Sequence, residues 1–361
     1  MTAKIDPWGA VEVAITDKLL HQFGLKPVTS NPFTIPSHFF SRKIIIAQRD
    51  LDKIVSCIKE KKPFFQLTGI ASSGPLHLGH KVDIDAFLYF KKLGAISKFV
   101  VSDIDAYVSR PDSKVPSMKH AKDKAVEIVA HLLALGLSKE DIYIQSQKEP
   151  RYYELAFEVS KKLTENEYKA IYGHMTLGKI SANLLQYADI LHLQLKEYLG
   201  PMHSITGIGI EQDPHARACR DISKKLPYNM KSPSFFYFKH QSGLQEGSKM
   251  SASEPQTAIY LSDSVSAVKK KIAKAFSGGR DTLEEHRKHG GNPDIDKAFE
   301  VLYFHHPDDT FVKDIYDKYK KGELLSGELK KICVSFLTEF LEGHQKKVET
   351  FIPIAEKMVF K

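Results

Sequence analysis

The stretch SGPLHLGH, residues 73–80, decides the fold, because it joins a turn of small residues to two histidines three positions apart. The apolar run before it, residues 64–70, predicts a buried strand, and the residues after it predict a helix that begins near His77. Unpaired N–H groups and the dipole at such a helix N-terminus attract phosphate. A glycine at 79 would let a nucleotide approach closely. We therefore expect a nucleotide site built by Ser73, Gly74, His77, Gly79 and His80.

A second stretch with chemical meaning is KMSAS, residues 249–253, in a loop rich in glycine and serine. A lysine ammonium is a compact point charge, which suits it to a pyrophosphate leaving group. Donors aimed at charge that develops in a transition state are typically the largest catalytic contribution. We expect the catalytic groups to be His77, His80 and Lys249, with Met250, Ser251 and Ser253 completing the ATP site.

Each stretch also has a simpler interpretation. An isolated His-x-x-His is more often a pair of surface histidines or part of a metal site, and an isolated Lys-Met-Ser-x-Ser is nearly always a solvated loop. No cysteine lies near the histidines, and Asp83 and Asp85 come later on the same predicted helix, so we expect no metal ligands here. Only the two stretches together favour nucleotide chemistry.

Composition places the chain among globular proteins. It has 361 residues, 42% of them hydrophobic, which is enough for two domains. Three widely spaced cysteines favour a reducing compartment over a disulfide framework. No apolar signal region follows Met1 and no run is long enough to span a bilayer, so we expect a cytoplasmic protein. The net charge of +8 is compatible with a nucleic-acid partner but does not require one.

Alternating strand and helix patterns predict a parallel α/β sheet with right-handed crossovers. The predicted strands are residues 64–70, 97–103, 141–145 and 203–210. The predicted helices between them begin near His77, at 119 and at 213. We expect residues 1–62 to be an extension that packs on a catalytic domain, 63–262, with a helical insertion at about 151–200. From a predicted helix cap at 262–264 onward the periodicity is helical, so residues 263–361 are expected to form a second, all-α domain.

Together, the two stretches resemble the HIGH and KMSKS signatures of the class I aminoacyl-tRNA synthetases, which activate an amino acid with ATP and load it onto tRNA. Further segments are similar to the tryptophanyl-tRNA synthetases, in particular GIEQDPH at 209–215, LQYADIL at 185–191 and AFSGGRDT at 275–282. The 275–287 segment matches the archaeal and eukaryotic branch. The resemblance covers almost the whole chain. It implies a Rossmann-type catalytic domain, an α-helical anticodon-binding domain, and the ligation of L-tryptophan to tRNA(Trp).

The resemblance also implies particular site residues. Gly209 and Glu211 would join the ATP site, with Glu211 accepting both ribose hydroxyls. Ala182, Gln186 and Asp189 are spaced i, i+4, i+7 and share one helix face. Asp189 there would accept the indole N–H, the one polar group of a tryptophan side chain. The other amino-acid-binding residues implied are Leu67, Asp105 and Gln212. ATP is expected with Mg²⁺, without a prosthetic group, and the protein is expected as a homodimer joined through the insertion, away from membranes.

Some positions depart from the family pattern and keep alternatives open. Glu211 stands where the family usually has Asp, and Ala182 and Leu67 stand where it usually has aromatic residues. A tyrosyl-tRNA synthetase is the main alternative, because an Asp at 189 equally accepts a phenolic O–H, although Leu67 occupies the place of that family's tyrosine-binding Tyr. A silent tRNA-binding paralogue has no need for both histidines and the loop lysine. A small-molecule nucleotidyltransferase lacks a helical tail suited to an anticodon.

Overall fold

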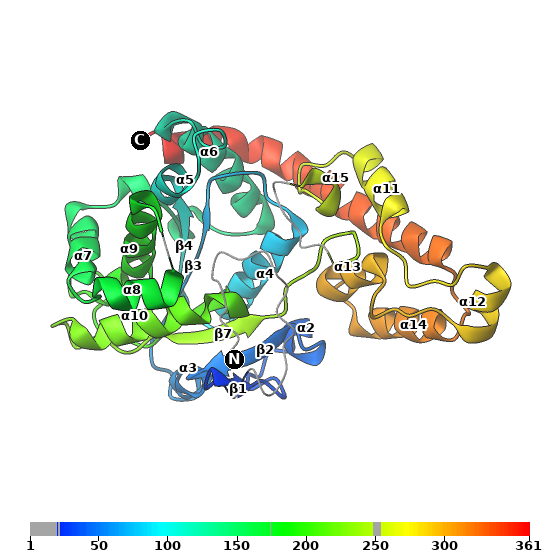
Figure 1. The fold of residues 1–361 in the computed structure, drawn as a ribbon, viewed down its shortest axis with the longest axis horizontal. Helices are drawn as coiled ribbons and strands as arrows, with labels where there is room; N and C mark the ends of the chain where they lie inside the picture. The colour runs from blue at the N-terminus through cyan, green and yellow to red at the C-terminus, as the bar shows by residue number, and fades with distance from the viewer. Residues whose placement is uncertain (1–19, 21, 174, 248–253) are drawn as a thin grey trace.

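The computed structural model describes residues 20, 22–173, 175–247 and 254–361. Its centre is a seven-stranded sheet in the order β1-β2-β7-β6-β3-β4-β5 (Figure 1). The strands are β1 (Lys26–Pro27), β2 (Ile45–Arg49), β3 (Phe65–Ala71), β4 (Ile96–Ser102), β5 (Ile142–Ile144), β6 (Ser204–Gly209) and β7 (Ser234–Phe238). The four predicted strands correspond to β3, β4, β5 and β6. The expected parallel α/β arrangement is confirmed for β3 to β7.

The strands that the sequence did not predict lie on one side of this sheet. β2 pairs antiparallel with β7, and β1 pairs antiparallel with β2, so the sheet is mixed rather than wholly parallel. β7 is a run of five buried residues with no alternation of polar and apolar positions, because both of its faces are covered. Phe235 and Tyr237 pack in one hydrophobic cluster, while Phe236 and Phe238 pack in another.

Helices surround the sheet. Those of the α/β part are α2 (His38–Ser41), α3 (Leu51–Lys59), α4 (Leu78–Lys92), α5 (Asp103–Ser109), α6 (Met118–Leu135), α7 (Pro150–Ser160), α8 (Glu165–Tyr172), α9 (Leu177–Leu191) and α10 (Asp213–Lys225). The helix predicted to begin at 119 corresponds to α6, and Gly136 caps its end at a φ of 113°. Short 3₁₀ turns are η1 (Lys139–Asp141), η2 (Gln145–Gln147), η3 (His192–Gln194), η4 (Ile210–Gln212) and η5 (Pro255–Thr257).

The ladder between β3 and β6 determines where a ligand can bind. β3 pairs with β4 over all seven of its residues, but with β6 only at Phe65↔Ser204 and Gln66↔Ile205. The chain passes from β3 to β4 and β5 on one side, and β6 and β7 lie on the other. In sheets that reverse their strand order in this way, ligands bind beyond the carboxyl ends of the two strands at the reversal. The turn after β3 and the residues after β6 are therefore placed at the expected site.

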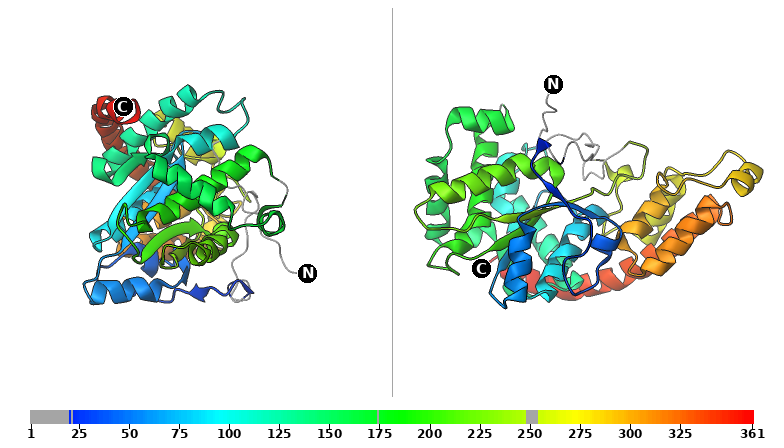
Figure 2. Two further views of the ribbon diagram at one scale, coloured as in Figure 1. Left: turned by 90° about the vertical axis from the view of Figure 1, so that its left-hand side faces the viewer. Right: turned by 90° about the horizontal axis from the view of Figure 1, so that it is seen from below.

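The C-terminal helices form an arm that returns to the α/β part. They are α11 (Val265–Lys274), α12 (Leu283–His289), α13 (Lys297–His305), α14 (Asp309–Lys320) and α15 (Ser326–Val359). Ser264 caps α11 as predicted, its hydroxyl accepting from the N–H of Ala267. Figures 1 and 2 show that α11 to α14 project away from the sheet while α15 runs back alongside α6. The helical character expected after residue 262 is confirmed.

The contact between α15 and the α/β part is buried and specific. His131 Nδ1 of α6 lies 2.8 Å from His344 Nε2 of α15. The side-chain amide of Gln345 donates to the carbonyl oxygens of Leu261 and Asp263, each at 3.0 Å. One hydrophobic cluster includes residues of α6 together with residues of α11, α13 and α15. The two predicted domains therefore share a core, and the boundary near 262 stays a prediction.

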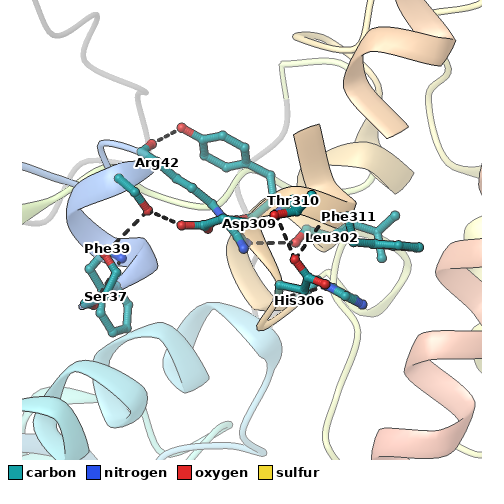
Figure 3. Close-up of polar contacts among 11 residues, drawn as sticks. Ser37, Phe39, Arg42, Leu302, His306, Asp309, Thr310 and Phe311 are labelled. Atoms are coloured by element: carbon teal, nitrogen blue, oxygen red, sulfur yellow. Dashed lines mark hydrogen bonds and ion pairs between the residues drawn. The ribbon is translucent and has the colours of Figure 1, made fainter. Parts of the chain in front are cut away.

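The arm is also attached to the N-terminal region, through Arg42 (Figure 3). Its Nε donates to Asp309 Oδ1 at 2.6 Å, and its Nη1 donates to the carbonyl oxygens of Tyr303 at 2.8 Å and Leu302 at 3.4 Å. The hydroxyl of Ser41 donates to the other oxygen of Asp309 at 2.7 Å. Burial acts to raise the pKa of Asp309, but these hydrogen bonds and the positive charge of Arg42 outweigh it and lower that pKa.

Replacing Arg42 by Lys should weaken this attachment. An ammonium cannot reproduce the fork that contacts Asp309 and two carbonyl groups at once, so we expect Arg42→Lys to lower the free energy of unfolding by about 2 kcal/mol. Equilibrium urea unfolding measures this. Asp309→Asn is the control, with a smaller expected loss because the Asp309 side chain is 52% exposed. An unchanged urea midpoint in Arg42→Lys would contradict the attachment.

Candidate active site

The two histidines of the first motif open α4. His77 is the N-cap residue, as the predicted helix start requires, and its backbone N–H donates to His80 Nδ1 at 3.2 Å. The two rings stack with centroids 3.7 Å apart. Burial lowers the pKa of His77 to about 4, and burial together with the neighbouring His77 lowers the pKa of His80 well below its usual value. Both imidazoles are therefore neutral at pH 7, and they can offer a phosphate hydrogen bonds rather than full charges.

The start of α4 is bonded to a segment that lies far along the chain. The N–H of Leu78 donates to the carbonyl of Ile259 at 3.0 Å, and the N–H of Leu261 donates to the carbonyl of Leu76 at 2.9 Å. His77 and Tyr260 form an antiparallel bridge between these bonds. Residues 249–253, with the predicted site residues Lys249, Met250, Ser251 and Ser253, lie outside the described residues. Residues 259–261, six to eight positions after that motif, are however hydrogen-bonded beside the first motif.

The turn between β3 and α4 contains the other predicted phosphate-binding residues. The N–H of Ser73 donates to the carbonyl of Ala71 at 2.8 Å, and the N–H of Ser72 donates to the carbonyl of Ser102 at 3.3 Å. The turn is thus attached to the carboxyl end of β4. Gly74 lies in this turn and Gly79 in the first turn of α4, where the nucleotide prediction puts them.

Three ionisable groups converge near the carboxyl end of β6. His240 follows β7, and its Nε2 lies 2.6 Å from Oε2 of Glu211. Burial raises the pKa of Asp83 on α4 to about 7, with the nearby His240 opposing this shift and the nearby Glu211 adding to it. Gly209 and Glu211 were predicted for the ATP site. His240 and Asp83 were not, because nothing in the sequence indicates that β7 ends beside β6.

Asp189, the predicted indole acceptor, lies at the centre of a buried hydrogen-bond network. The hydroxyls of Tyr143 and Tyr152 donate to its Oδ1 at 2.8 and 2.6 Å, and the amide of Gln145 donates to its Oδ2 at 2.9 Å. The residue is 3% exposed. Burial raises its pKa to about 7, and the three hydrogen bonds oppose that shift. Since an ionised carboxylate accepts about four hydrogen bonds, one acceptor position remains beyond these three donors.

Gln145 links Asp189 to a second predicted residue. Its Oε1 accepts from the backbone N–H of Asp105 at 3.0 Å, while its amide donates to Asp189. Burial raises the pKa of Asp105, and a hydrogen bond from Ser109 at 2.8 Å opposes the shift. Gln145 and both tyrosines were not among the residues predicted from the sequence. In β5, Tyr143 alternates with two isoleucines, which indicates that its hydroxyl lies on the opposite face of the strand from the isoleucine side chains. The pattern does not indicate which residue that hydroxyl contacts.

The remaining predicted pocket residues lie at separate places. Leu67 is 3% exposed and packs in the same hydrophobic cluster as Phe65 and Tyr152. Ala182 is buried on α9 at 1% exposure, and Gln186 is partly exposed on the same helix. Gln212 is the N-cap residue of α10. Their role in binding an amino acid stays a prediction.

Two residues of the 209–215 motif hold the fold together. Asp213 is fully buried and accepts from Arg49 of β2 at 2.8 Å and from the hydroxyl of Tyr237 of β7 at 2.7 Å. His215 stacks on Tyr187 with centroids 4.2 Å apart, and its Nδ1 contacts the hydroxyl of Tyr172. Burial lowers the pKa of His215 to about 3. The motif thus anchors α10 to the unpredicted strands β2 and β7.

Two negative findings apply to the described part of the chain. Across residues 20, 22–173, 175–247 and 254–361, no group of three or more His, Cys, Asp or Glu side chains has a metal-binding arrangement. No helix within the same ranges combines the length and the apolar character needed to cross a membrane.

Paired histidines at the start of the helix after β3, placed at the strand reversal of the sheet, are the arrangement expected of a class I aminoacyl-tRNA synthetase. The sequence matches the family of "tRNA synthetases class I (W and Y)" over residues 59–342. It is 37% identical to the tryptophan–tRNA ligase of Aeropyrum pernix, over 99% of this chain and 98% of the relative. It is also 37% identical to that of Methanocaldococcus jannaschii, over the same shares.

A solved structure gives the same result. The crystal structure of tryptophanyl-tRNA synthetase from Aeropyrum pernix K1 matches with a TM-score of 0.89 and 37% identity, covering 98% of each chain. The chain therefore belongs to the class I tryptophanyl-tRNA synthetases of the archaeal and eukaryotic type. The family resemblance inferred from the motifs is confirmed, and the tyrosyl alternative is not favoured.

Removing the Asp189 carboxylate should destabilise the protein even without any ligand. Asp189→Ala would leave the hydroxyls of Tyr143 and Tyr152 and the amide of Gln145 buried without their acceptor, at about 1–3 kcal/mol for each unpaired group. We expect the free energy of unfolding to fall by about 3 kcal/mol or more. Asp189→Asn keeps one acceptor oxygen and a similar volume, so its loss should be smaller. Chemical denaturation of the apo protein checks both, and equal stability of Asp189→Ala and wild type would contradict the network.

Proposed function

We propose that this chain is a tryptophan–tRNA ligase. It activates L-tryptophan with ATP to tryptophanyl-adenylate, releases pyrophosphate, and transfers the tryptophanyl group to tRNA(Trp). The observation that carries the proposal is that the motif histidines, His77 and His80, lie at the strand reversal of the sheet. The chain around them matches tryptophan–tRNA ligases over nearly its full length.

The residues of the ATP site divide the work of adenylation. His77 and His80, kept neutral by burial, donate hydrogen bonds to the triphosphate, and the dipole at the α4 N-terminus favours its negative charge. Lys249 supplies the positive charge that the pyrophosphate needs as it leaves, and Met250, Ser251 and Ser253 of the same motif are assigned to the ATP site with it. Glu211 accepts the ribose hydroxyls. Mg²⁺ enters with ATP as part of the substrate, and no prosthetic group takes part.

Specificity is assigned to the network around Asp189. In this proposal the indole N–H of tryptophan takes the fourth acceptor position of the carboxylate, next to Tyr143, Tyr152 and Gln145. A site whose buried polar group needs one particular hydrogen bond rejects ligands that leave it unpaired. Gln186 and Gln212 would bind the ammonium and carboxylate of the amino acid, Asp105 its ammonium, and Leu67 and Ala182 would line the ring.

Amino-acid-dependent exchange of pyrophosphate into ATP tests this function. We expect exchange with L-tryptophan and, among the twenty amino acids, at least tenfold less with any other, including tyrosine. The control is Lys249→Ala, in which the loss of one aimed charge should lower the rate by about two orders of magnitude. Exchange with tyrosine and not tryptophan would move the protein to the tyrosyl alternative, and exchange with none would favour a silent paralogue.

We assign tRNA recognition to the C-terminal arm, but not to all of its basic residues. Lys330 donates to the carbonyl oxygens of Ala273 and Ala275 at 2.9 and 2.8 Å, and so caps the end of α11. Arg280 and Arg287 donate to backbone carbonyl oxygens of the same arm. A groove of about 810 Å³ between α11 and α15 is lined by Lys269 and Lys331 among others. The lining also includes Glu339 and Glu342, so we assign contact with an RNA phosphate backbone to Lys269 and Lys331 rather than to the groove as a whole.

The homodimer and its location are part of the same proposal. An apolar groove of about 490 Å³ lies between the helices of the insertion, α7, α8 and α9, and Leu177 in its lining is 81% exposed. Phe157 of α7 is 75% exposed on the same insertion. Large exposed apolar residues around a groove are typical of interaction sites. The cytoplasm is the compartment we propose, and the name of the yeast relative, which is 34% identical, includes "cytoplasmic".

Leu177→Glu should disrupt this dimer. A charge on an exposed apolar residue of the groove costs little folding energy but must be desolvated when two copies associate. We expect sedimentation velocity to show a dimer for the wild type and a monomer for Leu177→Glu. Ser181→Glu, one turn further along α9 and also exposed, is the matched control and should remain dimeric if the contact is centred on Leu177. A monomeric wild type would remove the dimer from the proposal.

A further inference from the structure

His240 and Glu211 lie together against the end of β6. A Cβ atom built on Gly209 would lie 2.4 Å from both carboxylate oxygens of Glu211 and 2.4 Å from His240 Nε2. The two side chains therefore occupy the space directly beside the Gly209 backbone, which is open only because glycine has no side chain. The 2.6 Å separation of Nε2 and Oε2 is a short hydrogen bond. The carboxylate thus has a defined position before any ligand arrives.

The residues that follow His240 point elsewhere. Gln241 Oε1 lies 2.8 Å from His305 Nε2 on α13, and the hydroxyl of Ser242 contacts Glu300, also on α13. The segment after β7 therefore has one side chain on the carboxylate of the predicted ATP site and two on the C-terminal arm. Among residues 240–242, His240 is therefore the one that contacts Glu211.

Charge gives His240 a second effect. Glu211 and Asp83 are two carboxyl groups that interact with each other and with His240. An anionic nucleotide would be repelled by two such groups, and a hydrogen-bond donor on one of them offsets part of that repulsion. Glutamate also has one more side-chain torsion than aspartate, so its carboxylate needs a further contact to be held in one orientation.

We propose that His240 is a positioning residue for ATP, which holds the carboxylate of Glu211 against Gly209 in the orientation that accepts the two ribose hydroxyls. This inference rests on the proposed function, because it takes Glu211 as the ribose acceptor. His240 itself touches no reacting atom in this scheme. Its loss should weaken ATP binding while the chemical step and tryptophan binding change little.

The test compares His240→Ala with His240→Gln. Alanine removes the donor, and the amide nitrogen of glutamine can replace Nε2 at a similar reach. We expect His240→Ala to raise the KM for ATP about tenfold, with kcat and the KM for tryptophan within about twofold of wild type, and His240→Gln to restore most of the ATP affinity. His240 is 39% exposed in its side chain, so these variants should remain folded. Thermal unfolding checks this.

A double-mutant cycle separates positioning from a general structural effect. If His240 acts through Glu211, then His240→Ala should add no further loss of ATP affinity in a Glu211→Gln background. Ser242→Ala, which loses its contact with α13 instead, is the matched control and should keep the wild-type KM for ATP. An equal loss from His240→Ala in both backgrounds, no rescue by glutamine, or an equal rise in the KM for tryptophan would overturn the inference.

Direct binding keeps this test independent of turnover. Titration calorimetry with a non-hydrolysable ATP analogue measures nucleotide affinity even if no amino acid is activated. Wild-type binding without exchange would refute the proposed function and still leave the effect of His240 measurable. Exchange by the wild type with unchanged nucleotide affinity in His240→Ala would refute the positioning role alone.

Discussion

Two backbone hydrogen bonds hold the candidate active site together. They join residues 76–78, at the start of α4, to residues 259–261, which lie six to eight positions after the lysine motif. Because both partners are backbone groups, the contact depends on chain geometry more than on side-chain identity. It places the histidine pair and the segment after the lysine motif side by side across about half of the sequence. Helix α15, which packs on α6, also holds residues 259–261 in place, because the side-chain amide of Gln345 donates to the carbonyl of Leu261.

Burial determines the charge state of the groups gathered there. The imidazoles of His77 and His80 are neutral because they are desolvated, and burial raises the pKa of Asp83 to about 7. A site of neutral donors with a partly protonated carboxyl group accommodates a triphosphate with less repulsion than ionised carboxylates would. In the proposed function the full positive charge comes from Lys249, which lies outside the described residues.

Several residues that identify the family prove to support the fold. Asp213 bonds to β2 and β7, and Arg280, Arg287 and Lys330 bond to backbone carbonyl groups within the arm. Such residues are as restrictive as ligand-binding ones, since a buried polar group without its partner is costly. A family motif can therefore be characteristic because its residues support the fold around the site. The contacts in the structure show which motif residues are already bonded within the protein and which are left to bind a substrate.

The sequence by itself indicated the reaction class, through the resemblance of its motifs. It also predicted the strands β3 to β6 and the helices α4, α6 and α10, because strand and helix periodicity and helix caps are local properties. It further predicted a nucleotide site between the histidine and lysine motifs, and that site stays a prediction. It did not reveal β2 or β7, whose pairing joins residues 45–49 to 234–238, or the donors of Asp189 on β5, η2 and α7. Those contacts exist only once the sheet brings distant segments together. The partner of Glu211 was decided in the same way, since His240 reaches it only because β7 pairs beside β6.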